Sequence, residues 1–130
     1  MINKKKRVLV DLSATIVHHG HVRLIKKAKK FGNVIIALTT DKEIKKHKGY
    51  YPELNFSNRK EILESIKYVD KVIKSNLKIT NQFLKKNKID ILIRGSDYRN
   101  ERFEIPVKIF SRTRNISSSK IRKKSAKIII

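Results

Sequence analysis

The segment "DLSATIVHHGHVRLIKKAKKF", residues 11–31, changes from a strand pattern to a helix pattern. The preceding run RVLVDL, residues 7–12, predicts a first strand, and apolar residues recur at helical spacing through residues 20–31. Three of the chain's four histidines lie at the junction, around Gly20, in the sequence HHGH. This strand–histidine–helix junction is the feature from which the fold and the function are predicted.

The rest of the chain continues the alternation of strands and helices. Strands are predicted at residues 33–40, 71–74, 89–95 and 105–110, and helices at 41–46, from Ser57 or Asn58 onward, at 80–87 and after the serines of residues 117–119. Asp41 is predicted to cap the second helix. Such alternation favours a parallel sheet covered by helices on both faces, within a single domain of residues 1–130.

Positive charge dominates the composition. The 130 residues include 33 Lys and Arg against 11 Asp and Glu, a net charge of +22 that would attract nucleic acid, anionic membranes or phosphorylated small molecules. The alternative is that most lysines only fill solvated helix faces. The lack of cysteine excludes disulfides and thiolate metal sites. No apolar run approaches the length of a membrane span, so we expect a soluble cytoplasmic protein with no membrane partner.

Unusual polar residues follow four of the predicted strands at the point where each ends. SATIVHHGH (13–21) follows the first strand, TTDKEIKKHKG (39–49) the second, RGSDY (94–98) the fourth and SRTRNISSSK (111–120) the fifth. In open α/β sheets, ligands bind outside the carboxyl ends of the strands. The sequence therefore predicts a binding site along this rim.

The histidines at the first junction suit an anion. His21 falls in the first turn of the predicted helix and His18 just before it, where free backbone N–H groups and the helix dipole favour a phosphate. Gly20 would let that phosphate approach the backbone closely. Paired histidines also serve as metal ligands, but cysteine is absent and carboxylates nearby are sparse, so no metal site is predicted. His19 is predicted to be a solvated loop residue.

A second phosphate-binding site is predicted near the C-terminus. Arg112 precedes a helix start that carries Ser117, Ser118 and Ser119, and Lys48 adds a mobile positive charge from elsewhere on the rim. By itself the serine run could be only a helix cap. Asp97 could similarly form a turn with Gly95.

These segments together resemble one known family. HHGH fits the H-x-G-H signature of nucleotidyltransferases of the cytidylyltransferase type. Residues 38–49, 59–73, 89–98 and 112–122 resemble, in the same order, further segments of that family. The resemblance covers nearly the whole chain. The sequence is most similar to glycerol-3-phosphate cytidylyltransferases and to the cytidylyltransferase domains of phosphonate-pathway and phosphocholine-type enzymes. It implies an α/β fold, a Rossmann-like three-layer sandwich with a five-stranded parallel sheet.

The resemblance also implies an activity and a set of site residues. A phosphate or phosphonate oxygen of a small substrate would attack the α-phosphorus of CTP in line, and diphosphate would leave. Mg²⁺ is expected to accompany CTP, and family members are commonly homodimers. Catalytic roles are expected for His18, His21, Lys48 and Arg112, and nucleotide binding for Ser13, Ala14, Gly20, Gly95, Asp97, Thr113, Ser117, Ser118 and Ser119.

Three of the family's motifs are altered in this chain. G-T-F-D is replaced by residues 12–15 (LSAT), so Thr15 stands in place of an acid, and G-D-D-W is replaced by residues 95–98 (GSDY), where Ser96 stands in place of another. The glycine of R-T-x-G-I-S is Asn115, the next most tolerant residue at positive φ.

Two alternative functions stay open. H-x-G-H also serves adenylyltransferases that act on sugar or cofactor phosphates. The net charge alone would also fit a catalytically degenerate nucleotide-binding or nucleic-acid-binding module. A single-strand nucleic-acid binder needs aromatic residues among its basic ones, and the chain has no Trp. We therefore expect CTP and a small phosphorylated substrate as partners, rather than nucleic acid.

Overall fold

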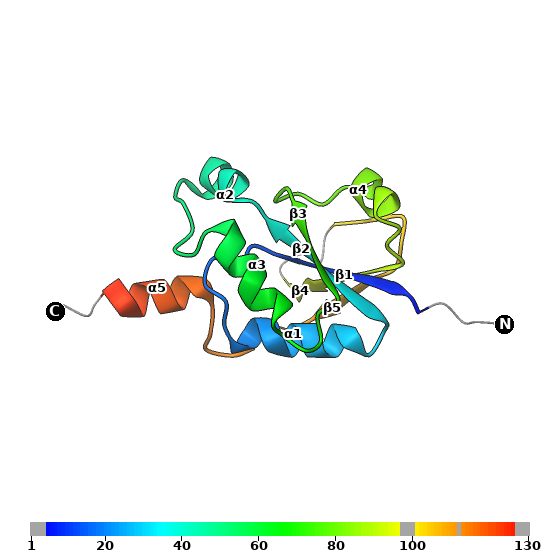
Figure 1. Cartoon of the computed structure of the whole chain (residues 1–130), viewed down its shortest axis with the longest axis horizontal. Helices are drawn as coiled ribbons and strands as arrows, with labels where there is room; N and C mark the ends of the chain where they lie inside the picture. Colours follow the sequence, from blue (N-terminus) through cyan, green and yellow to red (C-terminus); the bar gives the residue numbers. More distant parts are fainter. Residues whose placement is uncertain (1–4, 97–100, 112, 127–130) are drawn as a thin grey trace.

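A five-stranded parallel sheet forms the centre of the molecule (Figure 1). The computed structural model describes residues 5–96, 101–111 and 113–126. The strands are β1 (Arg7–Leu12), β2 (Asn33–Thr39), β3 (Lys71–Ser75), β4 (Ile91–Gly95) and β5 (Val107–Phe110). The helices are α1 (His19–Lys29), α2 (Asp41–Lys48), α3 (Phe56–Glu64), α4 (Asn81–Lys86) and α5 (Ser118–Ala126). No helix in these described ranges is long and apolar enough to cross a membrane.

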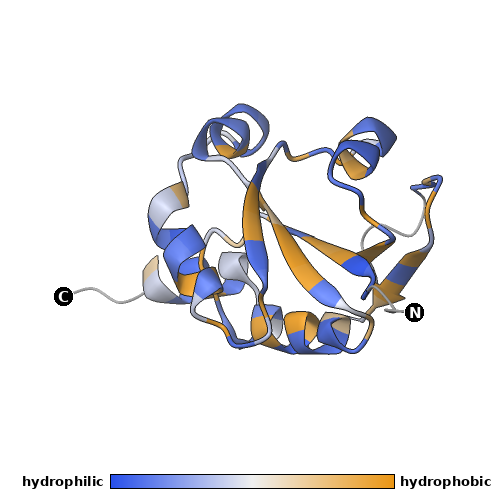
Figure 2. Cartoon of the chain, turned by 45° about the vertical axis from the view of Figure 1, so that its right-hand side comes forward, coloured by the Kyte–Doolittle hydropathy of each residue, from blue (hydrophilic) through white to orange (hydrophobic). Residues whose placement is uncertain are grey.

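Helices cover both faces of the sheet. On one face, Val8 and Val10 of β1 pack in a cluster with Ile25 of α1 and Leu63 of α3. On the other face, Leu9 of β1 packs in a second cluster that includes the buried leucine of α4. Figure 2 shows the hydrophobic colour along the strands and alternating hydrophobic and hydrophilic bands along α1. The predicted three-layer α/β sandwich is confirmed.

The strand order fixes where a ligand can bind. The order is β3-β2-β1-β4-β5, so the chain builds outward from β1 to β3 and then returns to the other side of β1. The gap between β1 and β4 is therefore the topological switch point of the sheet, where α/β proteins bind ligands beyond the carboxyl ends. Asp11 near the end of β1 and Gly95 at the end of β4 flank this point.

Two predicted helix caps were wrong. The side chain of Asn55, not Ser57 or Asn58, accepts a hydrogen bond from the first turn of α3. Thr40 caps α2, while the neighbouring Asp41 forms a hydrogen bond with a residue of α3. Both errors have one cause, because several Ser, Thr, Asn and Asp residues precede each helix and any of them could act as a cap.

Other boundaries differ by a few residues. α1 begins at His19, so this exposed histidine is the first residue of the helix rather than part of a loop. β4 begins at Ile91 and β5 at Val107, each two residues later than predicted. Within the residues that the structure describes, the order and type of the helices and strands are as predicted.

Candidate active site

A cavity of about 230 Å³ lies at the carboxyl ends of β1 and β4. Every predicted site residue that the structure describes lines it: Ser13, Ala14, His18, Gly20, His21, Lys48, Gly95, Thr113, Ser117, Ser118 and Ser119. Two further predicted residues, Arg112 and Asp97, lie outside the described residues. Segments up to about a hundred residues apart in sequence thus meet around one cavity, while the role of each side chain stays a prediction.

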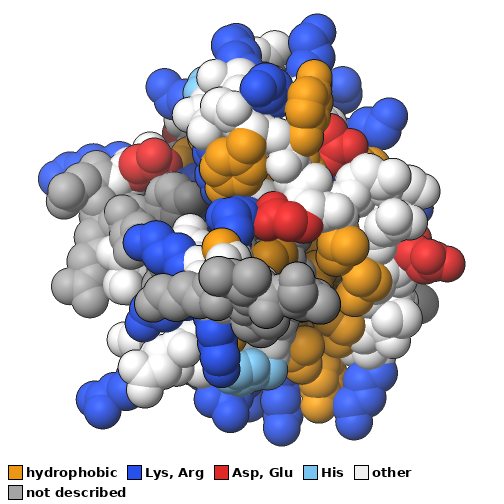
Figure 3. Space-filling model, turned by 90° about the vertical axis from the view of Figure 1, so that its left-hand side faces the viewer, with side chains coloured by type: hydrophobic (Ala, Val, Ile, Leu, Met, Phe, Trp, Pro, Cys, Tyr) orange, Lys and Arg blue, Asp and Glu red, His pale blue; other side chains and the backbone are white. Residues whose placement is uncertain are grey.

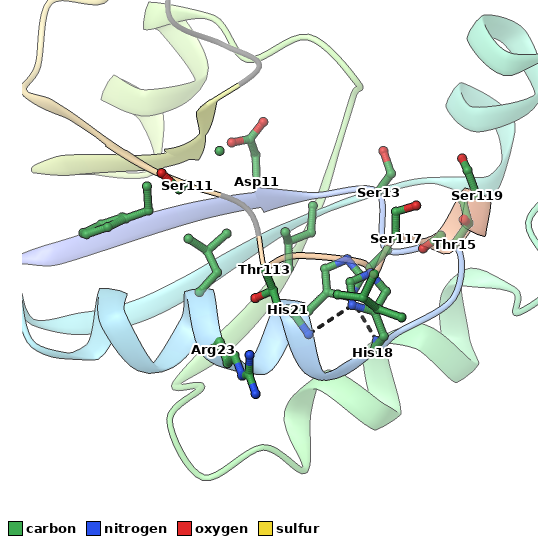
Figure 4. Close-up of a pocket in the computed structure, with 18 of the residues that line it drawn as sticks. Asp11, Ser13, Thr15, His18, His21, Arg23, Ser111, Thr113, Ser117 and Ser119 are labelled. Carbon is green, nitrogen blue, oxygen red and sulfur yellow. Dashed lines mark hydrogen bonds between the residues drawn. The ribbon is translucent and has the colours of Figure 1, made fainter. Parts of the chain in front are cut away.

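The imidazoles of His18 and His21 lie side by side at the start of α1 (Figure 4). Their ring centroids are 3.8 Å apart and the rings are stacked. The backbone N–H of Gly20 donates to Nδ1 of His18 at 3.1 Å, and the backbone N–H of His18 donates to Nδ1 of His21 at 3.1 Å. Because each Nδ1 accepts a hydrogen bond, the neutral form of each ring carries its proton on Nε2. The Nε2–H group is therefore the donor that each ring can offer to a phosphate oxygen.

Gly20 is required by the packing of His18. A Cβ atom at this position would lie 2.8 Å from Cε1 and 2.9 Å from Nδ1 of His18, and 3.3 Å from Cγ2 of Ile116. The glycine therefore gives the His18 ring the space it needs to fold back and cap the helix. This adds a role that the sequence did not indicate, beside the predicted close approach of a phosphate.

The start of α5 forms the facing wall. Ser117 Oγ accepts a hydrogen bond from the backbone N–H of Lys120 at 3.0 Å, which caps the helix. Ser118 Oγ donates to the carbonyl of Ile16 at 2.8 Å and accepts from its N–H at 3.2 Å, so α5 is tied to the loop after β1. Ser119 is exposed and lines the cavity. Neither α1 nor α5 has an acidic residue in its first turn, so both helix dipoles favour an anion between them.

A buried arginine holds the loop after β1. Arg59 of α3 is 0% exposed and donates to the carbonyls of Ser13 at 2.7 Å and Thr39 at 2.9 Å, and to Asp41 at 2.6 Å. Burial lowers the pKa of Arg59, and the hydrogen bond with Asp41 partly offsets that effect. Ala14, buried in this loop, has φ 45°, a conformation that costs energy for a residue with a Cβ. The loop that carries Ser13 is therefore fixed by long-range contacts.

A second buried arginine crosses the switch point. Arg94 of β4 donates to both carboxylate oxygens of Asp11, at 3.2 and 3.0 Å, and pairs with Glu101. Burial opposes a charge on Arg94, but the hydrogen bonds with Asp11 and Glu101 outweigh it and raise the pKa of Arg94. Asp11 lines the cavity, yet the sequence did not single it out, because its partner lies 83 residues away.

Basic side chains from α1 and α2 line the cavity. Lys48 is the last residue of α2, and Gly49, with φ 81°, ends the helix there and turns the chain. Arg23 and Lys27 of α1 also line the cavity. Figure 3 views the molecule from the side of α5; Lys and Arg side chains surround that face, and Asp and Glu side chains are few. The local field around the cavity thus favours a polyanion.

The described residues do not form a protein-held metal centre. Within them, no group of three His, Asp or Glu side chains could hold a metal ion. Asp11 is the single acidic residue among the described residues that line the cavity, and both of its oxygens are bound to Arg94. Mg²⁺ usually keeps several waters and binds through substrate phosphates with one or two carboxylates. This side-chain set alone does not fit a Mg²⁺ site.

The parallel sheet, with H-x-G-H at its first crossover and a cavity at its switch point, defines an α/β domain of the nucleotidyltransferase class. Residues 13–124 match the cytidylyltransferase-like family. The chain is 34% identical to a glycerol-3-phosphate cytidylyltransferase of Staphylococcus aureus, over 90% of this chain and 92% of that one. It is 31% identical to the Bacillus subtilis protein of the same name, over 93% and 98%. The chain belongs to the cytidylyltransferase-like family.

A solved structure shares the fold. The lipopolysaccharide core biosynthesis protein from Thermoplasma volcanium superposes with a TM-score of 0.65 at 22% identity, covering 83% of this chain and 96% of that one. At this identity the similarity concerns the fold alone.

Proposed function

We propose that this chain is a CTP-dependent cytidylyltransferase that transfers CMP to a small phosphorylated alcohol or phosphonate. An oxygen of the acceptor's phosphate or phosphonate forms a bond to the α-phosphorus of CTP. The bond from that phosphorus to the bridging oxygen of the β-phosphate breaks, and diphosphate leaves with the electron pair. The other product is a CDP-linked alcohol when the acceptor is a phosphate ester, and a CMP-linked phosphonate when the acceptor is a phosphonate.

One observation supports this proposal above the others. His18 and His21 at the start of α1 and the serines at the start of α5 line the same cavity, although about a hundred residues separate them in the chain. A triphosphate between them would meet two imidazoles, the hydroxyls of Ser117 and Ser119 and the positive ends of two helix dipoles. The Ser118 hydroxyl donates instead to the carbonyl of Ile16, which ties α5 to the loop after β1. Lys48 would add its ammonium group from the end of α2.

The chemistry needs no nucleophile from the protein. A phosphate monoester loses its second proton near pH 6, so at neutral pH the acceptor oxygen is already an anion. Catalysis then consists of positioning and of stabilising the charge that develops on the transferred phosphoryl group. In this proposal the Nε2–H groups of His18 and His21 stabilise that charge. The cytosine base lies against Gly95, where there is open space, since no atom lies within 4 Å of a Cβ built at this position.

Mg²⁺ is part of the proposal as a companion of CTP. When bound to the triphosphate it would neutralise charge on the phosphate oxygens. The described cavity supplies no unshared carboxylate for it, so the chain's contribution is to bind the phosphates themselves.

Diphosphate release with CTP or ATP and a panel of phosphomonoesters and phosphonates tests the proposal. Turnover with CTP and one of these acceptors is expected, and exclusive use of ATP would overturn the choice of nucleotide in favour of an adenylyltransferase. Binding of RNA that survives His18→Ala and His21→Ala, without turnover of either nucleotide, would favour a binding module instead.

The homodimer and the cytoplasmic location implied at the level of sequence stay part of this proposal. Light scattering coupled to size-exclusion chromatography should give twice the mass of one chain, and cell fractionation should recover the protein with the cytoplasm.

A further inference from the structure

The helix that carries the predicted triphosphate-binding serines has no buried side chain. None of the residues from Ser118 to Ala126 in α5 is buried. Apolar burial is the main stabiliser of most helices in proteins, so α5 lacks the usual means of attachment. Polar contacts must therefore account for much of its position on the body of the molecule.

Arg122 makes the largest set of these polar contacts. Its Nε and Nη2 donate to the two carboxylate oxygens of Glu53 at 2.5 and 2.7 Å, and Nη2 also donates to Thr15 Oγ1 at 3.1 Å. Its guanidinium lies 4.6 Å from the ring centroid of Tyr50. A two-pronged carboxylate contact with an aromatic face beside it is the arrangement that arginine, and not lysine, can make.

These contacts join three walls of the cavity. Arg122 lies one helical turn after Ser118, which is itself hydrogen-bonded to the loop after β1. Thr15 belongs to that same loop and is buried. Tyr50 and Glu53 belong to the segment directly after Lys48. The single guanidinium therefore connects the loop after β1, the segment after α2 and helix α5.

We propose that Arg122 and Glu53 are positioning residues that hold α5 against the cavity and so set the distance between its serines and the rest of the nucleotide site. This inference rests on the proposed function. It also explains how the loop is organised without the family's acid at position 15, because the hydroxyl of Thr15 accepts a hydrogen bond from Arg122. The hydrogen bond to Arg122 lowers the pKa of Glu53, and the same bond raises the pKa of Arg122, so both stay charged at neutral pH.

Three variants and a matched control test the inference. Glu53→Gln removes the negative charge with little change of shape, Arg122→Gln removes the guanidinium, and Arg122→Lys keeps the charge without the two-pronged contact. Glu64→Gln is the control, since Glu64 accepts two hydrogen bonds from Lys60 on the exposed surface of α3, away from the cavity.

Hydrogen exchange of the α5 amides, measured without nucleotide, reports docking of the helix. Steady-state diphosphate release, measured with CTP as the varied substrate, reports how docking of α5 affects KM for CTP and kcat. Both Gln variants at positions 53 and 122 should exchange faster in residues 118–126 and raise KM for CTP about fivefold, with kcat within about twofold of the parent. Arg122→Lys should give an exchange rate and a KM for CTP between those of the two Gln variants and those of the parent. Glu64→Gln should match the parent in both measurements.

Unchanged exchange of α5 in both Glu53→Gln and Arg122→Gln would overturn the inference, as would a loss of kcat at constant KM. The proposed function fails separately, if the parent protein releases no diphosphate from CTP. In that case faster exchange in the two variants would still establish that the ion pair docks α5.

Discussion

Replacing His18 by asparagine should separate the two tasks assigned to this histidine. Its Nδ1 accepts the backbone N–H of Gly20 at 3.1 Å and so caps α1, while its Nε2–H is the donor proposed for the phosphoryl group. Asparagine is among the best capping residues, so His18→Asn should keep the cap and lose the imidazole. His18→Ala should lose both.

The two variants should therefore differ in stability but not in turnover. Loss of one hydrogen-bond donor to a developing charge lowers kcat by about 10²- to 10³-fold, and this loss should occur in both variants. Loss of a helix cap costs about 1 kcal/mol, and only His18→Ala should show it. The corresponding fall in Tm is about 3 to 5 °C for a domain of this size.

Calorimetry and steady-state diphosphate release measure these two effects on the same preparations. The expected result is a parent-like Tm for His18→Asn together with the full loss of kcat. Turnover of His18→Asn within about tenfold of the parent would refute the proposed role of the imidazole. A Tm as low as that of His18→Ala would refute its role as the cap.

Three further predictions concern Gly20, Arg59 and Asp70. Gly20→Ala should displace the His18 ring and so lower kcat, while the lost helix cap and the about 1 kcal/mol by which alanine favours a helix should nearly cancel and leave Tm close to that of the parent. An unchanged kcat in initial-rate measurements would contradict this prediction. Arg59→Met should lower the free energy of unfolding, measured by urea titration, by about 3 kcal/mol or more, because the substitution leaves buried carbonyls and a carboxylate without their hydrogen-bond donor. A loss of less than about 1 kcal/mol would contradict this prediction. Burial opposes the charge of Asp70, but hydrogen bonds from Lys29 and a backbone N–H outweigh burial and lower the pKa of Asp70. The ionised carboxylate should therefore stabilise the fold above about pH 4, and this stabilisation should be lost as the pH falls further. Asp70→Asn should lower Tm at pH 7 but not near pH 2, and a difference in Tm that does not change with pH would contradict this prediction.

Local patterns in the sequence were sufficient for the architecture. Strands such as Asn33–Thr39 are apolar on both faces, as a parallel sheet between two helix layers requires. The site could be predicted for a related reason, because the carboxyl ends of parallel strands meet at one edge and bring His18 and Ser117 to the same place. Asn115 adopts φ 61°, in line with its replacing a glycine of the family motif.

Contacts between residues far apart in the chain could not be predicted from the sequence. Arg59 and Arg94 lie in segments that resemble the family, but nothing in the local sequence indicates that their side chains are buried. Their importance depends on partners 18 and 83 residues away, Asp41 and Asp11, which only the folded chain brings near. The same holds for Arg122, whose partner Glu53 is 69 residues away. A signal did exist, since acids are scarce in this chain and each one is a potential partner for a buried cation.

The histidines at the start of α1 and the serines at the start of α5 should hold the same triphosphate, and one titration can measure this. Titration of isotope-labelled protein with CTP, followed by NMR of the imidazole nitrogens of His18 and His21 and of the backbone amides of Ser117–Ser119, would measure both groups at once. Both sets of resonances should shift along one binding curve with CTP, and cytidine, which lacks phosphates, should shift neither set appreciably. Shifts confined to one set, or two curves with different affinities, would contradict this prediction.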